Sequence, residues 1–253
     1  MEDKHIEKKD SEKVMEKTLV VLLVLGLALT VFNQFQILSL KSGNNGELAT
    51  GMTIVQAAVI PTGTPEIYGQ ELQIRYSDVT PNNPELADQT ISVLGNLDRS
   101  ITLEGENLKR YIAIASQISC EYCCGAGSII VTEKDVADLN AKIEQAISTG
   151  KITREQAEEY RKSAGTAACG CAHSFAMRGL AKYLISKHGS EFTDEQILDE
   201  MAKWKTLFFP TQMAAKADVM KQQGIEFSYA NLGSNRYRGI EQGNAGSGMV
   251  GGC

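Results

Sequence analysis

Residues 119–125 read SCEYCCG and residues 168–174 read ACGCAHS, and these two runs hold five of the six cysteines of the chain. The side chains in them that can ligate a metal are Cys120, Cys123, Cys124, Cys169, Cys171 and His173. Thiolates and imidazoles are preferred ligands of soft and borderline metals. We therefore expect the two runs to meet in space and to form the Cys-rich centre of one domain.

The same sulfurs allow other chemistry, and the sequence leaves three interpretations open. Besides a metal site, the cysteines could form structural disulfides, the usual expectation for an exported domain with an even number of cysteines, or a redox-active dithiol. Adjacent Cys123 and Cys124 are poorly placed to bridge each other. The five clustered cysteines cannot all pair without Cys253, which ends a Gly-rich tail. These points favour the metal site.

The number of ligands bears on which metal is expected. A closed zinc site needs four ligands, and Cys120, Cys123, Cys169 and Cys171 can supply them. Cys124 is then surplus, as is the imidazole, and a surplus of soft ligands suits Cu(I), which exchanges among neighbouring thiolates. An iron–sulfur cluster also needs four cysteines but is less expected outside the cytoplasm. The predicted cofactor is zinc or Cu(I).

The helix predicted to begin near Ala172 indicates the direction in which the imidazole of His173 projects. His173 lies four residues before Met177 and seven before Leu180, so its ring should project toward the buried side. Cys169 and Cys171 would then sit at the helix N-terminus, where the dipole favours a thiolate. The alternative is a core histidine bonded to a backbone carbonyl.

The N-terminal part of the chain predicts a membrane anchor. Residues 18–40 carry no charge and are long enough to span a bilayer. Five lysines precede this run, and Lys41 is the only lysine or arginine after it before Arg75, which places the N-terminus in the cytoplasm and the rest of the chain outside. The alternatives are a buried helix or a long signal peptide. The predicted location is therefore the cell membrane, crossed once.

These features divide the chain into five parts. They are a cytoplasmic tail (1–17), a transmembrane anchor (18–40), an extended linker (41–82), a helical Cys-rich domain (83–228) and a Gly-rich flexible tail (229–253). The formal net charge of −6 argues against a nucleic-acid partner. No phosphate-binding glycine loop is present, and no acid at recognisable spacing orients a Cys–His pair, so the sequence carries no enzyme signature.

The fold class predicted for the domain is mostly α. Capping residues and apolar spacing predict seven helices, beginning near Pro84, Glu106, Thr132, Thr153, Ala172, Thr193 and Pro210. The residues expected on their inward faces include Val93 in the first helix, Leu139, Ile143 and Ile147 in the third, Met177, Leu180 and Leu184 in the fifth, and Met201 in the sixth. The second is expected to run into Cys120, and the third and fourth to fold back as a hairpin that brings residues 124 and 169 together. Short strands are possible at 53–60 and 71–76.

A local resemblance accompanies these patterns. Cys169-Gly170-Cys171, with His173 two residues on, resembles the core of bacterial exported proteins that share a Pro-Cys-Tyr-Cys-Gly-Cys motif. The whole pattern also resembles membrane-anchored cysteine-rich proteins of archaeal type. The first likeness covers about five residues, and Ala168 stands where the motif has a cysteine. It implies an exported, cysteine-rich metal or redox module.

Overall fold

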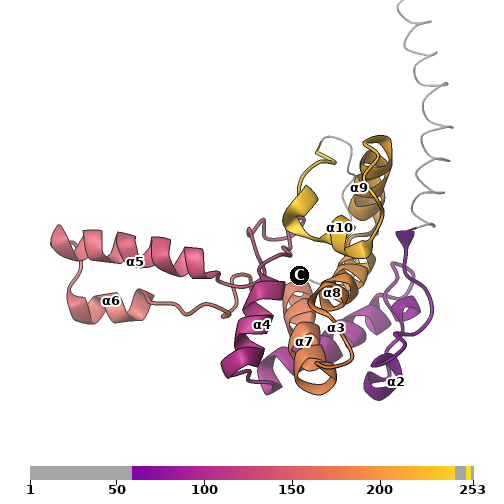
Figure 1. Cartoon of the computed structure of the whole chain (residues 1–253), viewed down its shortest axis with the longest axis horizontal. Helices are drawn as coiled ribbons and strands as arrows, with labels where there is room; N and C mark the ends of the chain where they lie inside the picture. The colour runs from indigo at the N-terminus through magenta and orange to yellow at the C-terminus, as the bar shows by residue number, and fades with distance from the viewer. Residues whose placement is uncertain (1–58, 243–248, 252–253) are drawn as a thin grey trace, which may run out of the picture. The chain divides into compact units, whose positions relative to one another are not determined.

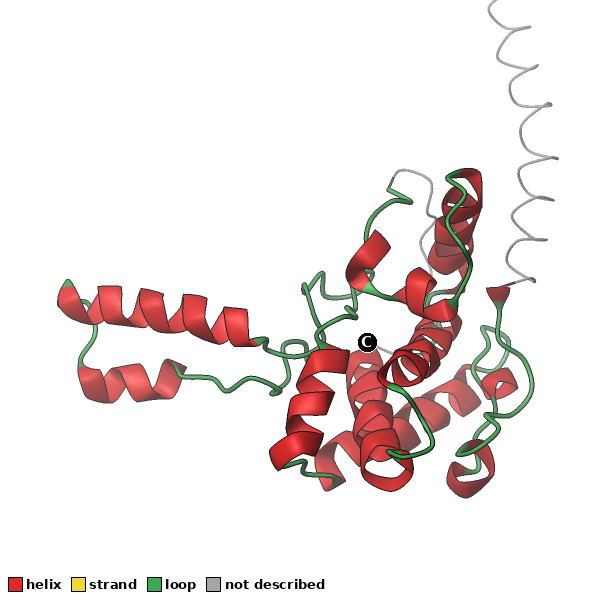
Figure 2. Cartoon of the chain, in the orientation of Figure 1, coloured by secondary structure: helices red, strands yellow, loops and turns green. Residues whose placement is uncertain are grey.

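The computed structural model describes residues 59–242 and 249–251, and within these ranges the chain is helical and has no β-strand (Figure 1 and Figure 2). The α-helices are α2 (Gly69–Leu72), α3 (Pro84–Ser100), α4 (Gly105–Ala115), α5 (Glu133–Ser148), α6 (Arg154–Tyr160), α7 (Ala172–His188), α8 (Asp194–Phe208), α9 (Pro210–Gln222) and α10 (Tyr229–Gly233). Two 3-10 helices are η1 (Tyr76–Asp78) and η2 (Asn235–Tyr237). The predicted mostly helical domain is thus confirmed.

The helix starts predicted from capping residues are also confirmed. Asn83 accepts the backbone N–H of Leu86 ahead of α3, whose first residue is a proline. At Thr132, Thr153 and Thr193 the hydroxyl accepts the N–H three residues on, and the side chain there accepts the threonine N–H in return. These contacts satisfy backbone donors that would otherwise lack a partner in the first turn.

Helix α7 forms the centre of the domain and packs most closely against α3. The two backbones approach each other at Gly179, where a Cβ atom would lie 1.9 Å from the carbonyl oxygen of Leu94. The predicted inward face of α7 is confirmed, because Met177, Leu180 and Leu184 are fully buried. Since α7 begins at the second cysteine run, the packing of this helix fixes where that run lies.

Residues 59–82 pack against the core, although the sequence assigns them to an extended linker. Tyr68 donates a hydrogen bond from its hydroxyl to Glu200 and accepts one from Trp204. Tyr76 donates to the same carboxylate at 2.6 Å. The strand expected at 71–76 is wrong, because α2 covers the first two residues of that segment, η1 begins at its last, and no strand lies between them. Both tyrosines bury a large apolar surface, and their hydroxyls need buried hydrogen-bond partners. These tertiary contacts outweigh the local strand propensity of the segment.

Two of the predicted helix features also differ from the structure. Helix α4 ends at Ala115, before Cys120, because Ile118 pairs with Ser234 in an isolated antiparallel bridge. In α3 the buried residues include Ile91, whereas Val93 of the predicted stripe is 38% exposed. The first difference involves a contact with a segment distant in sequence, which helical spacing does not report.

Helices α5 and α6 form an arm that extends away from the other helices (Figure 1). Ile143 and Ala157 are buried between the two helices, while Leu139 and Ile147 on the predicted inward face remain half-buried because α5 packs on α6 alone. The chain returns from the arm directly to the second cysteine run. The predicted hairpin connection between residues 124 and 169 is confirmed.

The membrane anchor and the first predicted strand fall largely outside the described residues, which begin at residue 59. Within the described ranges, none of the helices has both the length and the apolar character needed to cross a bilayer. Residues 229–242 and 249–251, predicted as part of a flexible tail, include α10 and the buried Val250. The N–H of Val250 donates to the carbonyl oxygen of Phe208 at 2.8 Å, which ties this segment to α8.

Candidate metal centre

The first cysteine run lies in the loop between α4 and α5, and the second lies in the loop that leads into α7. The N–H of Ala168 donates to the carbonyl oxygen of Ile129, which joins the two loops. Buried Arg178 on α7 donates to the carbonyl oxygens of Ile129 and Cys169 and forms an ion pair with Asp98 at 2.9 Å. One side chain of the central helix therefore holds both loops in place.

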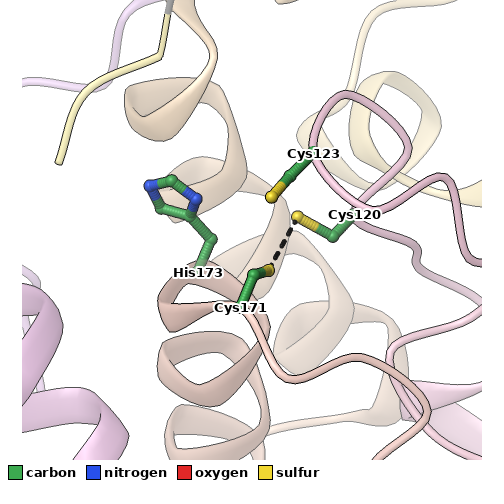
Figure 3. Close-up of side chains that lie close together, drawn as sticks. All are labelled: Cys120, Cys123, Cys171 and His173. Carbon is green, nitrogen blue, oxygen red and sulfur yellow. Dashed lines mark hydrogen bonds between the residues drawn. The ribbon is translucent and has the colours of Figure 1, made fainter. Parts of the chain in front are cut away.

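The two runs meet at their sulfur atoms. Sγ of Cys120 lies 3.3 Å from Sγ of Cys171, and both residues are buried free cysteines. The ligand atoms of Cys120, Cys123, Cys171 and His173 all lie within 4.8 Å of one another, although the sulfur of Cys123 is disulfide-bonded in this structure. Figure 3 shows the three cysteine side chains converging beside the imidazole. The expectation that the clusters come together is confirmed.

Cys171 is the N-cap residue of α7, and its surroundings favour a thiolate. Its Sγ accepts the backbone N–H of Ser174 at 3.4 Å and lies 3.3 Å from the hydroxyl of the same residue. The hydrogen bond with Cys120 lowers the pKa of Cys171 to about 4; burial opposes this shift, and the nearby imidazole of His173 and the contacts with Ser174 add to it. The same bond with Cys171, together with burial, raises the pKa of Cys120. These opposite pKa shifts favour Cys171 as the thiolate and Cys120 as the thiol of the pair.

His173 is fully buried, and its two ring nitrogens differ. Nε2 lies 2.8 Å from the carbonyl oxygen of Val250, so this nitrogen carries the proton and donates it. Nδ1 is buried and has no hydrogen-bond partner. The ring packs between Phe208 and Phe209, with centroids 4.8 and 5.0 Å away. A lone pair on Nδ1 is therefore left beside the three sulfurs.

Cys124 and Cys169 are joined by a disulfide that closes a separation of 45 residues. Cys124 is exposed and Cys169 is buried. The bridged sulfurs offer no thiolate, so these two predicted ligands are not part of the group around His173. Both sulfurs nevertheless lie within 4.8 Å of Sγ of Cys171. The sixth cysteine, Cys253, lies outside the described residues.

A buried group of charges lies next to Cys120. Oε1 of Glu121 is 3.0 Å from Nζ of Lys205 and 3.7 Å from Nζ of Lys216, and both lysines are fully buried. Arg238 lies 3.3 Å from the other carboxylate oxygen. Burial lowers the pKa of Lys205 to about 8, against the attraction of Glu121. Lys205 therefore remains mainly protonated at neutral pH.

Sequence reasoning missed both lysines. Lys205 follows Met201, a predicted core residue, by four positions and therefore lies on the buried face of α8. That spacing was the available signal, because a charged residue on a buried face needs a buried partner.

Comparison of the chain with protein-family models, with curated proteins and with solved structures found no match in any of the three.

Proposed function

We propose that this protein binds zinc or Cu(I) through the thiolates of Cys120 and Cys171 and Nδ1 of His173, with Cys123 as a further ligand when its sulfur is reduced. The observation that carries the proposal is the buried Nδ1 without a hydrogen-bond partner beside sulfur atoms. A core histidine would pair both ring nitrogens, since an unsatisfied buried acceptor costs about 1–3 kcal/mol. A metal would satisfy that lone pair.

The spacing of the ligand atoms fits a tetrahedral or trigonal site. Four ligands about 2.3 Å from a zinc ion lie about 3.8 Å from one another. The present atoms lie within 4.8 Å, and the closest pair, the sulfurs of Cys120 and Cys171, is 3.3 Å apart. Metal binding would therefore open that pair by about half an ångström. No backbone rearrangement is needed for a change of this size.

The residues around the proposed ligands already form hydrogen bonds with them, as the outer-shell residues of a metal site do. The bond from Nε2 of His173 to Val250 fixes the ring and its tautomer, as metal-binding histidines require. The N–H and the hydroxyl of Ser174 support the sulfur of Cys171. These contacts would hold the ligands in place before the metal arrives, which lowers the cost of ordering them.

The buried charges nearby balance a metal–thiolate site. Lys205, Lys216 and Arg238 carry three positive charges. Glu121 and the buried Glu241, which accepts a hydrogen bond from Tyr122, carry two negative charges. One positive charge is left over. The thiolate of Cys171 offsets this charge in the metal-free chain, and a zinc ion with three thiolates and a neutral imidazole, or Cu(I) with two thiolates, has the same net charge of −1, so metal binding would preserve the balance.

Burial favours a retained metal over an open catalytic one. Cys120 and His173 are fully buried, and Cys171 is only 9% exposed. A catalytic metal keeps an open coordination position for water or substrate, whereas a structural site is closed. The proposed role is accordingly a structural or metal-handling centre, held by a domain that residues 18–40 anchor outside the cytoplasm. The Cys124–Cys169 disulfide supports that location, because disulfides persist in oxidising compartments.

The proposal is tested by metal titration of the full-length chain with His173→Gln as the variant. The wild-type chain should bind one zinc or Cu(I), and the variant should raise the Kd by more than about 100-fold, because it removes a ligand rather than an outer partner. His188→Gln is the matched control, since His188 is also buried but pairs with Glu71 and Glu191. Equal affinity in both variants, or no binding by the wild type, would contradict the proposal.

A further inference from the structure

The disulfide and the two free thiols form one contiguous set of sulfurs. The bridge between Cys124 and Cys169 lies within 4.8 Å of Sγ of Cys171, and Cys171 is in turn 3.3 Å from Cys120. Sγ of Cys124 also lies 3.7 Å from the carbonyl oxygen of Cys120. An oxidised pair that reaches the surface therefore adjoins a reduced pair in the interior.

We propose that the disulfide exchanges between these two pairs, so that the metal site proposed above, on which this inference rests, is switched by the position of one bridge. With the bridge at Cys124–Cys169, the thiols of Cys120 and Cys171 are available to the metal. With the bridge at Cys120–Cys171, two of the ligands are lost and the exposed Cys124 becomes a free thiol. Metal binding and a reactive surface thiol then exclude each other.

The exchange needs no outside oxidant. The thiolate of Cys171 attacks Sγ of Cys124, forms a Cys124–Cys171 bond and releases Cys169 as a thiolate. Cys120 then attacks Sγ of Cys171, forms the Cys120–Cys171 bond and releases the thiolate of Cys124, while the proton of Cys120 passes to a released thiolate. One disulfide and two reduced cysteines are present before and after. Attack of Cys171 on Sγ of Cys169 is disfavoured, because the resulting Cys169–Cys171 bridge spans only Gly170 and closes a very small ring.

The exposure of the cysteines determines which one can react with a molecule in solution. Cys124 is the exposed member of the set, whereas Cys120 is fully buried and Cys171 is 9% exposed. A thiol-reactive molecule in solution therefore reaches the chain through Cys124, and only after the bridge has moved inward. The partner predicted by this chemistry is a disulfide, because the free thiol of Cys124 exchanges with a disulfide without an added oxidant.

Trapping with N-ethylmaleimide tests the exchange on the folded, full-length, metal-free chain. The expected product carries the reagent on Cys124 and Cys169 and a bridge between Cys120 and Cys171, as mapped by peptide mass spectrometry. Zinc at 100 times its Kd should slow formation of this product about 100-fold, because the sulfur of Cys171 cannot attack the bridge while it is bound to the metal. If the exchange does not occur, the Cys124–Cys169 bridge persists and neither Cys124 nor Cys169 carries the reagent.

Two further readouts separate this inference from the proposed function. If the chain binds metal stoichiometrically but the original bridge persists with and without metal, the exchange is excluded and the metal site stands. If no metal binds, the proposed function fails and the switch fails with it. In Cys120→Ser the transfer should stop at the Cys124–Cys171 bond, so Cys124 should stay bridged; labelling of Cys124 in this variant would contradict the proposed sequence of steps.

Discussion

Replacing Glu121 with glutamine should lower the free energy of unfolding of the metal-free chain by about 3–5 kcal/mol. Glu121 is the carboxylate that Lys205 and Lys216 share, and both lysines are fully buried. Glutamine keeps the shape of the side chain but removes its charge, so two cations lose their counter-ion in a region that water does not reach. A loss of this size corresponds to a fall in Tm on the order of 10 °C.

Thermal and denaturant unfolding with a chelator present would measure this loss without any contribution from metal. Glu144→Gln is the matched control, because Glu144 pairs with Arg161 at the surface, where such a pair contributes about 0–1 kcal/mol. Equal and small losses in the two variants would show that Glu121 does not neutralise the buried lysines.

Replacing Cys120 and Cys171 together with serine should abolish metal binding and leave the Cys124–Cys169 bridge in place. Replacing Cys124 and Cys169 together should have the opposite effect: the metal is retained, and the chain loses about 4 kcal/mol of stability, the value that the chain-entropy treatment gives for a separation of 45 residues. Each double variant removes two sulfurs from the same centre, so each is the matched control of the other.

Metal content and unfolding free energy, measured on both double variants, separate a metal site from a disulfide scaffold. A scaffold without metal would show the stability loss in the Cys124 and Cys169 variant and no change of any kind in the Cys120 and Cys171 variant. Full metal content in the variant that lacks Cys120 and Cys171 would contradict the ligand set proposed here.

Local sequence features account for much of the fold. The capping pairs that begin α5, α6 and α8 act over three residues, so their sequence spacing is sufficient to predict them. The end of α4 at Ala115 is followed by the bridge between Ile118 and Ser234, which are distant in sequence. Such contacts leave no trace in helical periodicity, and this is where the sequence-based expectations differ from the structure.

The candidate metal centre was likewise predictable from the sequence only in part. The meeting of the two cysteine runs and the burial of His173 could be predicted from spacing and helix phase. The choice of Cys124 and Cys169 as the bridged pair could not, because disulfide connectivity depends on the three-dimensional arrangement of the loops. Val250, whose carbonyl orients the imidazole, lies in a Gly-rich segment that carries no signal of packing. The metal itself stays a prediction.

X-ray absorption spectroscopy of the full-length chain loaded with zinc or Cu(I) tests the metal centre most directly, because it reports the atoms bound to the metal. The account predicts sulfur at about 2.3 Å together with nitrogen at about 2.0 Å, and loss of the nitrogen contribution in His173→Gln. A shell made only of oxygen and nitrogen, or an unchanged spectrum in that variant, would contradict it.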